Sequence, residues 1–258
     1  MEVRSIELPV AQTWYVPFDP RLFVHEVSLL VTPTTATNPS LLEMAHGQDH
    51  IVSTREHLRS LYRAPSRLVV EKERPVIDAA TREFLRLCPF VLIGTVGGDG
   101  TADVSPRGGP PGFIQVLDDT HVAIADLSGN NRLDTLDNIV SNGEVGLLFV
   151  MPGQGETVRL NGSAYLTTDP ELLGGFTAEL KPPKLAIVVR VVGTFIHCAK
   201  AMQRSHIWEP ETWLEFGSVP DGADIIACQN LVPDEVTADM IRANLAESYE
   251  RDLTNERA

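Results

Sequence analysis

Short apolar runs separated by turn residues dominate the middle of the chain. The run FVLIGTV (90–96) is followed by the turn sequence GGDGT (97–101) and by ADVSPRG (102–108), a pattern that predicts a β-hairpin. Five further segments have the same strand-like character: 114–119, 121–126, 145–151, 157–168 and 184–198. Antiparallel strands at such short spacing predict a β-barrel.

Helical periodicity is found between these strands and on both sides of them. A capping-box pattern at 53–56 begins one predicted helix, and Pro89 ends another. The other helical signals follow the 3.6-residue period of an amphipathic helix. The predicted helices after the first cover 78–88, 129–142, 169–180 and 233–255, with a further helical signal at 199–208. The fold class is therefore α+β, mainly β with flanking helices.

The first 48 residues differ from the rest of the chain. They are rich in proline, and their apolar residues come in short runs, of which VHEVSLLV (24–31) predicts a strand. We therefore divide the chain into an N-terminal arm or lid at 1–48, a core domain at 49–210, and a C-terminal loop and helix at 211–258 that pack on the core.

The composition limits the classes of partner. The chain has 258 residues, 43% of them hydrophobic, which suffices for one full core. Its formal net charge of −14 disfavours binding to nucleic acid and to anionic membranes. A small anionic ligand remains compatible with this charge, because a few arginines and a helix N-terminus can form a local positive pocket.

The cysteines and histidines indicate neither a disulfide framework nor a metal site. The cysteines are Cys88, Cys198 and Cys228, an odd and widely spaced set that favours a reducing compartment. No Cys/His set completes the pair His46 and His50. The N-terminus lacks a signal-peptide pattern, and no apolar run is long enough to span a bilayer. We expect a cytoplasmic protein.

Two motifs contain the residue types that hold a phosphate or a planar polar ring. In VSPRG (104–108), Ser105 and Arg107 supply a hydroxyl and a guanidinium, and Gly108 permits close approach of a ligand to the backbone. In GNNRLDTLDNI (129–139), Asn130 or Asn131 can cap a helix whose first turn carries Arg132 and Thr135 on one face. The alternatives are a β-turn with a surface arginine and an ordinary capped amphipathic helix.

Two later motifs are weaker candidates. In RLNGSA (159–164), Gly162 inside a strand predicts a bulge or a close backbone approach, and Arg159 faces either a cleft or solvent. In HCAKAMQRSHIW (197–208), His197 is a candidate proton donor, and a helix from Ala199 would place Lys200, Arg204 and Trp208 on one face. Each of these residues is also compatible with a purely structural role.

These four motifs occur in the order in which they occur in a known superfamily. Over roughly residues 50–210, the chain resembles the pyridoxamine 5′-phosphate oxidase-like proteins, and more narrowly a bacterial branch of FMN-dependent enzymes. The resemblance implies a six-stranded antiparallel split barrel that forms a homodimer, with FMN bound between the subunits. No lysine follows Arg132, whereas the family's phosphate segment is Ser-Arg-Lys rich.

The resemblance also implies an activity and a set of site residues. It implies an oxidoreductase that transfers hydride between a small organic substrate and flavin N5, with His197 and Lys200 in catalytic roles. The implied cofactor-binding residues are Ser105, Arg107, Gly108, Asn131, Arg132, Thr135, Arg159, Arg204 and Trp208. The alternatives are a non-catalytic flavin or haem carrier, a deazaflavin-dependent reductase, and a structural dimer with an empty cleft.

Overall fold

The computed structural model describes residues 50–229 and 235–258. The predicted strand at 24–31 and the arm at 1–48 lie outside the described residues. The chain divides into two compact units, Met1–Arg63 and Ala64–Ala258. In the described part of the first unit, the hydroxyl of Thr54 caps helix α1 (Arg55–Ser60) by accepting from the backbone N–H of His57 at 3.1 Å.

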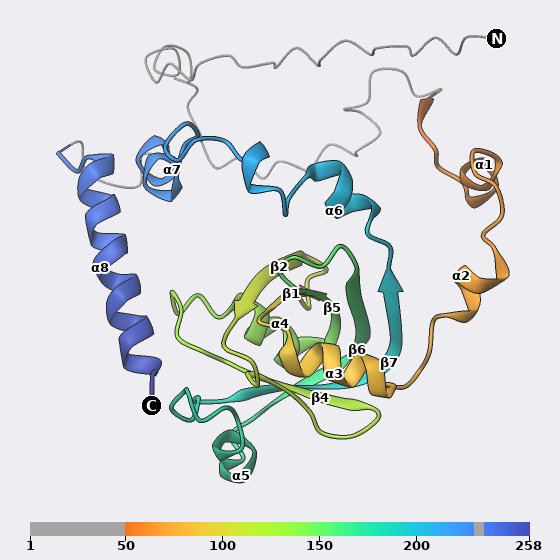
Figure 1. The fold of residues 1–258 in the computed structure, drawn as a ribbon, viewed down its shortest axis with the longest axis horizontal. Coiled ribbons are helices and arrows are strands. Elements are labelled where there is room, and N and C mark those ends of the chain that lie inside the picture. Colours follow the sequence, from red (N-terminus) through yellow and green to blue (C-terminus); the bar gives the residue numbers. More distant parts are fainter. Residues whose placement is uncertain (1–49, 230–234) are drawn as a thin grey trace, which may run out of the picture. The chain divides into compact units, whose positions relative to one another are not determined.

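The second unit is built around a single antiparallel sheet, which confirms the predicted fold class (Figure 1). Its strands are β1 (Phe90–Val96), β2 (Ala102–Gly108), β3 (Ile114–Val116), β4 (His121–Ala125), β5 (Glu144–Val150), β6 (Thr157–Thr167) and β7 (Ala186–His197). Their order is β2-β1-β5-β6-β7-β4-β3. The sheet has seven strands rather than six because the three-residue β3 pairs with β4 at one edge.

The β6–β7 pair joins the two halves of this sheet. Its ladder extends from the Thr157–His197 pair to the Thr167–Ala186 pair and is interrupted by a register shift between Asn161 and Gly162. The predicted bulge at Gly162 is therefore confirmed. A β-bulge increases the local bend and twist of a strand, which is how a long ladder can serve both halves of a curved sheet.

The sheet closes on itself as a barrel. The side chain of Arg107, on the edge strand β2, reaches within 3.7 Å of Asp126, which directly follows β4 near the opposite edge. Figure 1 accordingly shows the strands curving around a common interior. Apolar side chains fill this interior. Those with essentially no exposed surface include Val91, Ile93, Phe113, Ile124, Phe149, Leu160 and Ile187.

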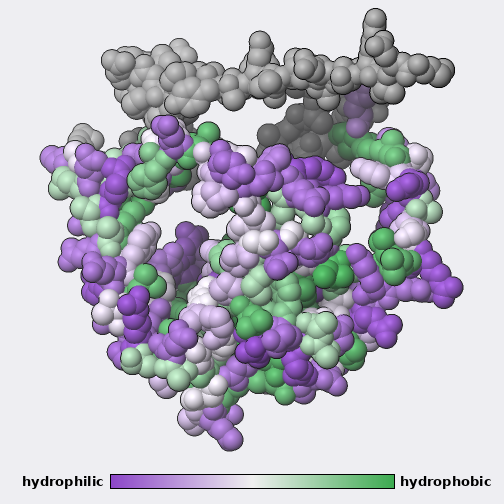
Figure 2. Space-filling view, viewed as in Figure 1, coloured by the Kyte–Doolittle hydropathy of each residue, from purple (hydrophilic) through white to green (hydrophobic). Residues whose placement is uncertain are grey.

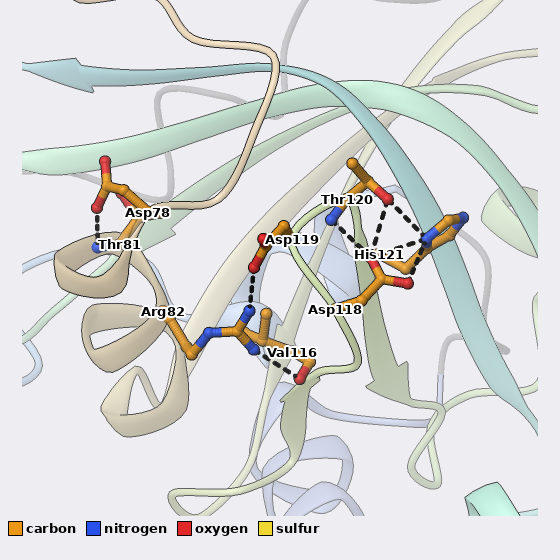
Figure 3. Close-up of polar contacts among 8 residues, drawn as sticks. All are labelled: Asp78, Thr81, Arg82, Val116, Asp118, Asp119, Thr120 and His121. Atoms are coloured by element: carbon orange, nitrogen blue, oxygen red, sulfur yellow. Dashed lines mark hydrogen bonds and ion pairs between the residues drawn. The ribbon is translucent and has the colours of Figure 1, made fainter.

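Helix α3 (Ala79–Leu87) is fastened to the β3–β4 hairpin by polar contacts (Figure 3). Asp78 caps the helix by accepting from the N–H of Thr81 at 2.8 Å. Arg82 donates to the carbonyl of Val116 at 3.2 Å and to the carboxylate of Asp119 at 2.8 Å. These contacts at the hairpin tip fix the barrel edge that precedes Asp126.

The remaining helices begin and end at different residues from those expected. The predicted helix 129–142 is shorter in the structure, where α4 covers Asp134–Ser141, and the predicted helix 169–180 is reduced to α5 (Pro170–Gly174). The predicted helix 233–255 is α8 (Ala238–Glu256). The other helices are α2 (Arg67–Glu71), α6 (Lys200–Ser205), the 3-10 turn Pro210–Thr212 and α7 (Gly222–Cys228).

Hydrophilic residues cover much of the described surface seen in Figure 2, and hydrophobic ones lie between them in small groups. Among the helices of the described residues, none is both long and apolar enough to cross a membrane. Those residues also contain no cluster of histidine, cysteine and carboxylate side chains that could hold a metal ion.

The bulge gives a first test. A Cβ at position 162 would lie 2.1 Å from the carbonyl oxygen of Arg190, so Gly162→Ala forces the β6–β7 backbones apart. We expect the free energy of unfolding to fall by about 2 kcal/mol or more, measured by urea denaturation. Gly174→Ala is the matched control, since its added Cβ meets no heavy atom within 4 Å. Equal stability of the two variants would contradict this account of the bulge.

The hairpin tip gives a second test, which depends on pH. The backbone N–H of Thr120, then its hydroxyl, and then His121 donate to Asp118 and lower the pKa of its carboxyl to about 2. The stability contributed by this carboxylate is present above the unfolded-state pKa of about 3.9 and is lost as the pH falls toward the folded value. An NMR carboxyl titration should place the midpoint near 2.

Thr120→Val removes the hydroxyl donor and keeps the backbone N–H donor, so the midpoint of Asp118 should rise part of the way toward the ordinary value. A wild-type midpoint near the ordinary value of about 3.9 would show that the Asp118 contacts do not persist in solution.

Candidate functional site

A cleft of about 960 Å³ opens beside β2. Its volume is at the upper end of the range of about 300–1,000 Å³ that is usual for small-molecule sites. Four parts of the chain line it: β2, the segment from Asp126 to Leu136, the loop 181–185, and the last turns of α8. It includes five of the predicted cofactor-binding residues: Ser105, Arg107, Asn131, Arg132 and Thr135.

The charges around the cleft are balanced, although the whole chain has a net charge of −14. Five cationic side chains and five carboxylates line it. The cations are those of Arg107, Arg132, Lys181, Lys184 and Arg251, and the carboxylates are those of Asp103, Asp126, Asp134, Asp252 and Glu256. The cleft is thus much less negative than the average surface of this protein, which makes it compatible with an anionic ligand.

Arg107 is held in place and still has an unused donor. The two-residue period of β2 places Asp103, Ser105 and Arg107 on the half-buried side of the strand. The guanidinium donates from Nη1 to the hydroxyl of Ser105 at 2.8 Å and to the carbonyl of Pro106 at 3.2 Å. Its Nε is buried and has no hydrogen-bond partner among the described residues. A buried donor without a partner is costly, and a bound acceptor would satisfy it.

Asp126 also lines the cleft, and its carboxylate lies 3.7 Å from the Nε of Arg107. Burial raises the pKa of its carboxyl, while the charges of Arg107 and Lys184 oppose that rise. The distance is too long for a hydrogen bond, so the ion pair does not satisfy Nε.

The segment before α4 differs from the predicted phosphate site. Helix α4 begins at Asp134 with Leu133 at its N-cap, so neither Asn130 nor Asn131 caps it, and that prediction is wrong. Asn131 instead adopts a left-handed backbone (φ 58°), and the side chain of Asn130 accepts from the N–H of Arg132 at 2.9 Å. The segment is therefore a turn stabilised by an asparagine side chain, which competes with helix formation.

This turn also separates Arg132 from Thr135. Arg132 precedes the helix, is exposed and forms an ion pair with Asp134, so the predicted shared helix face is wrong. Thr135 is buried and donates its hydroxyl to Asp103 at 3.1 Å. Both residues still line the cleft. The Thr135 hydroxyl is engaged by Asp103, whereas the Arg132 guanidinium is exposed beside Asp134.

The C-terminal helix contributes to the cleft, a role that the motif analysis missed. The N–H of Lys181 donates to the carbonyl of Glu256 at 2.8 Å, and its ammonium donates to the carbonyl of Asn255 at 2.9 Å. The N–H of Ser128 donates to the Glu256 carboxylate. These contacts bring Arg251 and Asp252 to the cleft wall. The sequence of α8 has no continuous apolar face that would have predicted this contact, because most of the helix is exposed.

The other predicted site residues do not line this cleft. Gly108 pairs with Phe90 in the β1–β2 hairpin, and Trp208 donates its indole N–H to the carbonyl of Gln154 at 2.7 Å. Lys200 and Arg204 lie one turn apart on α6, as predicted, and both are exposed. Trp208 does not continue their face, because the left-handed backbone of His206 (φ 52°) ends the helix.

Arg159 and His197 lie together at another place on the barrel, around the ring of Phe195. The Arg159 Cζ atom is 5.0 Å from the ring centroid, and the His197 ring contacts it edge-on at a centroid distance of 4.9 Å. Burial, then the charges of Arg159 and Lys72, lower the pKa of His197. The predicted site residues therefore do not form one site within a single chain. Some of them line the cleft beside β2, and Arg159 and His197 form a separate group around Phe195.

The structure is that of an α+β protein with a split β-barrel and a cleft beside β2. Residues 77–198 match the family model of pyridoxamine 5′-phosphate oxidase. The resemblance to this family that the sequence motifs predicted is thus confirmed over this part of the chain. No curated protein matches the chain.

Three solved structures illustrate the similarity. HupZ from Group A Streptococcus has 18% identity and a TM-score of 0.39, covering 46% of this chain and 93% of that one. A conserved hypothetical protein from Mycobacterium tuberculosis has 13% identity and a TM-score of 0.37, covering 49% and 87%. A pyridoxamine 5′-phosphate oxidase-related, FMN-binding protein from Nostoc punctiforme has 12% identity and a TM-score of 0.35, covering 46% and 78%.

The attachment of α8 gives a third test. Glu256→Ala removes the acceptor of the Ser128 N–H, so the amide of Ser128 should exchange with solvent about tenfold faster or more. The matched control is Glu250→Ala, which changes an exposed glutamate on the same helix. Hydrogen exchange followed by NMR measures both variants. Unchanged exchange at Ser128 in Glu256→Ala would show that this contact does not hold the helix at the cleft.

Proposed function

We propose that this protein is an FMN-dependent oxidoreductase in which hydride passes between a small organic substrate and flavin N5. The observation that carries the proposal is the buried, unpartnered Nε of Arg107 at the wall of a cleft that also contains Arg132. The family match adds support, because it covers the strands and the turn that supply both residues.

The residues of the cleft fit FMN. The cofactor has a polar ring edge rich in acceptors and a phosphate tail, and the cleft offers a guanidinium for each. Arg107, oriented by Ser105, would hold the ring edge, and the exposed Arg132 would hold the phosphate. Lys181 and Lys184 add positive charge from the loop 181–185. When bound, FMN supplies the redox chemistry, and the protein supplies position and electrostatics.

Thr135 is a weaker candidate than the sequence suggested. Its hydroxyl already donates to Asp103, so a phosphate would have to compete with that carboxylate. We therefore assign the phosphate contact to Arg132 and give Thr135 the role of holding Asp103 against α4.

We further propose that the active site is completed by a second copy of the chain in a homodimer. His197, Lys200, Arg204 and Trp208 lie outside the cleft of their own chain, so a second copy would have to supply them. Burial, then the charges of Arg159 and Lys72, lower the pKa of His197, which favours its neutral imidazole. In this role it accepts a proton from the substrate more readily than it donates one.

The proposal is tested by comparing two flavins. FMN and riboflavin differ by the phosphate alone, so Arg132→Gln should weaken FMN binding by about tenfold to a hundredfold and leave riboflavin binding nearly unchanged. Arg107→Gln should weaken both. Quenching of flavin fluorescence during titration measures each affinity. Arg86→Gln, which removes an exposed arginine paired with Glu83 on α3, is the control for net charge.

An equal loss of both flavins in Arg132→Gln would remove the phosphate assignment. Failure of the wild-type protein to bind either flavin, together with tight binding of haem or of a deazaflavin, would replace FMN by that cofactor.

A further inference from the structure

We infer that Lys72, Arg159 and His197 form a binding site for the anionic group of a small ligand, a carboxylate or a phosphate. The three side chains surround the ring of Phe195. The Lys72 Nζ atom is 4.3 Å from the ring centroid, the Arg159 Cζ atom is 5.0 Å from it, and the His197 ring contacts its edge at 4.9 Å. Two permanent cations and one titratable ring are thus gathered around one aromatic side chain.

The positive charge of this group is poorly compensated. Among the described residues, the one carboxylate within 4 Å of these cations is that of Glu73, which is 3.8 Å from Arg159. That distance exceeds a hydrogen bond, and the Nε of Arg159 is buried with no hydrogen-bond partner in the described part of the chain. An acidic protein that holds two cations together in this way has a local field that attracts an anion.

The direction of the His197 pKa shift agrees with a positive electrostatic field from Lys72 and Arg159. Its imidazole contacts the same Phe195 ring as Lys72 and Arg159, and after burial these two charges are the causes that lower its pKa. Glu73 does not reverse the direction of the shift. A bound anion would oppose both cations and would therefore raise the pKa of His197.

The backbone holds these side chains in position before any ligand binds. Arg159 lies opposite Phe195 in the β6–β7 ladder, and His197 ends the same ladder. The segment carrying Lys72 is attached to β7, because the backbone N–H and C=O of Arg74 both pair with Thr194, at 3.0 and 2.6 Å. The hydroxyl of Thr194 also donates to the carbonyls of Arg74 and Val76, at 3.0 and 3.1 Å. The backbone positions that carry these side chains are thus set before binding, which favours affinity.

This site differs from the flavin cleft. None of Lys72, Arg159 and His197 lines the cleft, and Lys72 precedes the part of the chain that matches the family model. The inference does not require a flavin, since it depends on the contacts around Phe195 alone. The one residue that it shares with the active site proposed for a homodimer is His197.

The test is an NMR titration of the His197 ring in the purified protein, with the whole chain present. Sulfate represents a phosphate group and formate a carboxylate, and each replaces chloride at constant ionic strength. We expect at least one of them to raise the pKa of His197 in a saturable manner. Arg159→Gln should weaken that anion by about tenfold. Arg190→Gln, which removes an exposed arginine from the same strand β7, should leave the affinity unchanged.

A pKa of His197 that is the same in chloride, sulfate and formate would overturn the inference. If Arg159→Gln fails to fold, the wild-type titration and Lys72→Met decide in its place. Addition of FMN to the sulfate-bound protein distinguishes the source of the anion. Retained sulfate supports a separate site, whereas displacement of sulfate from His197 by FMN, but not by riboflavin, would assign these residues to the cofactor phosphate and overturn it.

Discussion

The paired strands β6 and β7 are the constraint on which the rest of the structure depends. They are the longest strands of the sheet and the connection between its two halves, β2-β1-β5 on one side and β4-β3 on the other. The bulge at Gly162 lets this ladder bend, and the bend brings Arg107 of β2 to Asp126 behind β4. Without that curvature, the two walls of the cleft would lie at opposite edges of an open sheet. The same ladder places Arg159, Phe195 and His197 side by side.

Much of this fold follows from the sequence, because short apolar runs between turn residues identify strands well. All seven strands begin and end within a few residues of their predicted bounds. Gly162, inside a predicted strand, correctly indicated the bulge. The start of α4 was not predictable in the same way. Gly129, Asn130 and Asn131 resemble a helix cap, but the left-handed Asn131 turns the chain and delays the helix to Asp134. Side chains of asparagine support both structures, so local sequence alone does not decide between them.

The candidate site was predictable in its residue types and less so in its geometry. Ser105, Arg107 and Arg132 line one cleft because the barrel closes, and closure depends on contacts far apart in the sequence. The role of α8 depends on backbone contacts of 255–256 with 128 and 181, for which no motif exists. His197 and Arg159 form a second group because β6 and β7 place them at the far end of the ladder. An acidic chain thus has two places where several cations lie close together, and at each of them one arginine Nε is buried with no hydrogen-bond partner among the described residues.

The central claim is that the cleft beside β2 holds a flavin, and the absorption spectrum of the purified protein tests it most directly. The account predicts flavin bands, together with release of FMN on denaturation, identified by its mass. A colourless protein that also fails to take up added FMN would contradict it. In that case the unpartnered guanidinium of Arg107 would have to bind a different ligand, and the proposal that the protein is a flavin-dependent oxidoreductase would be wrong.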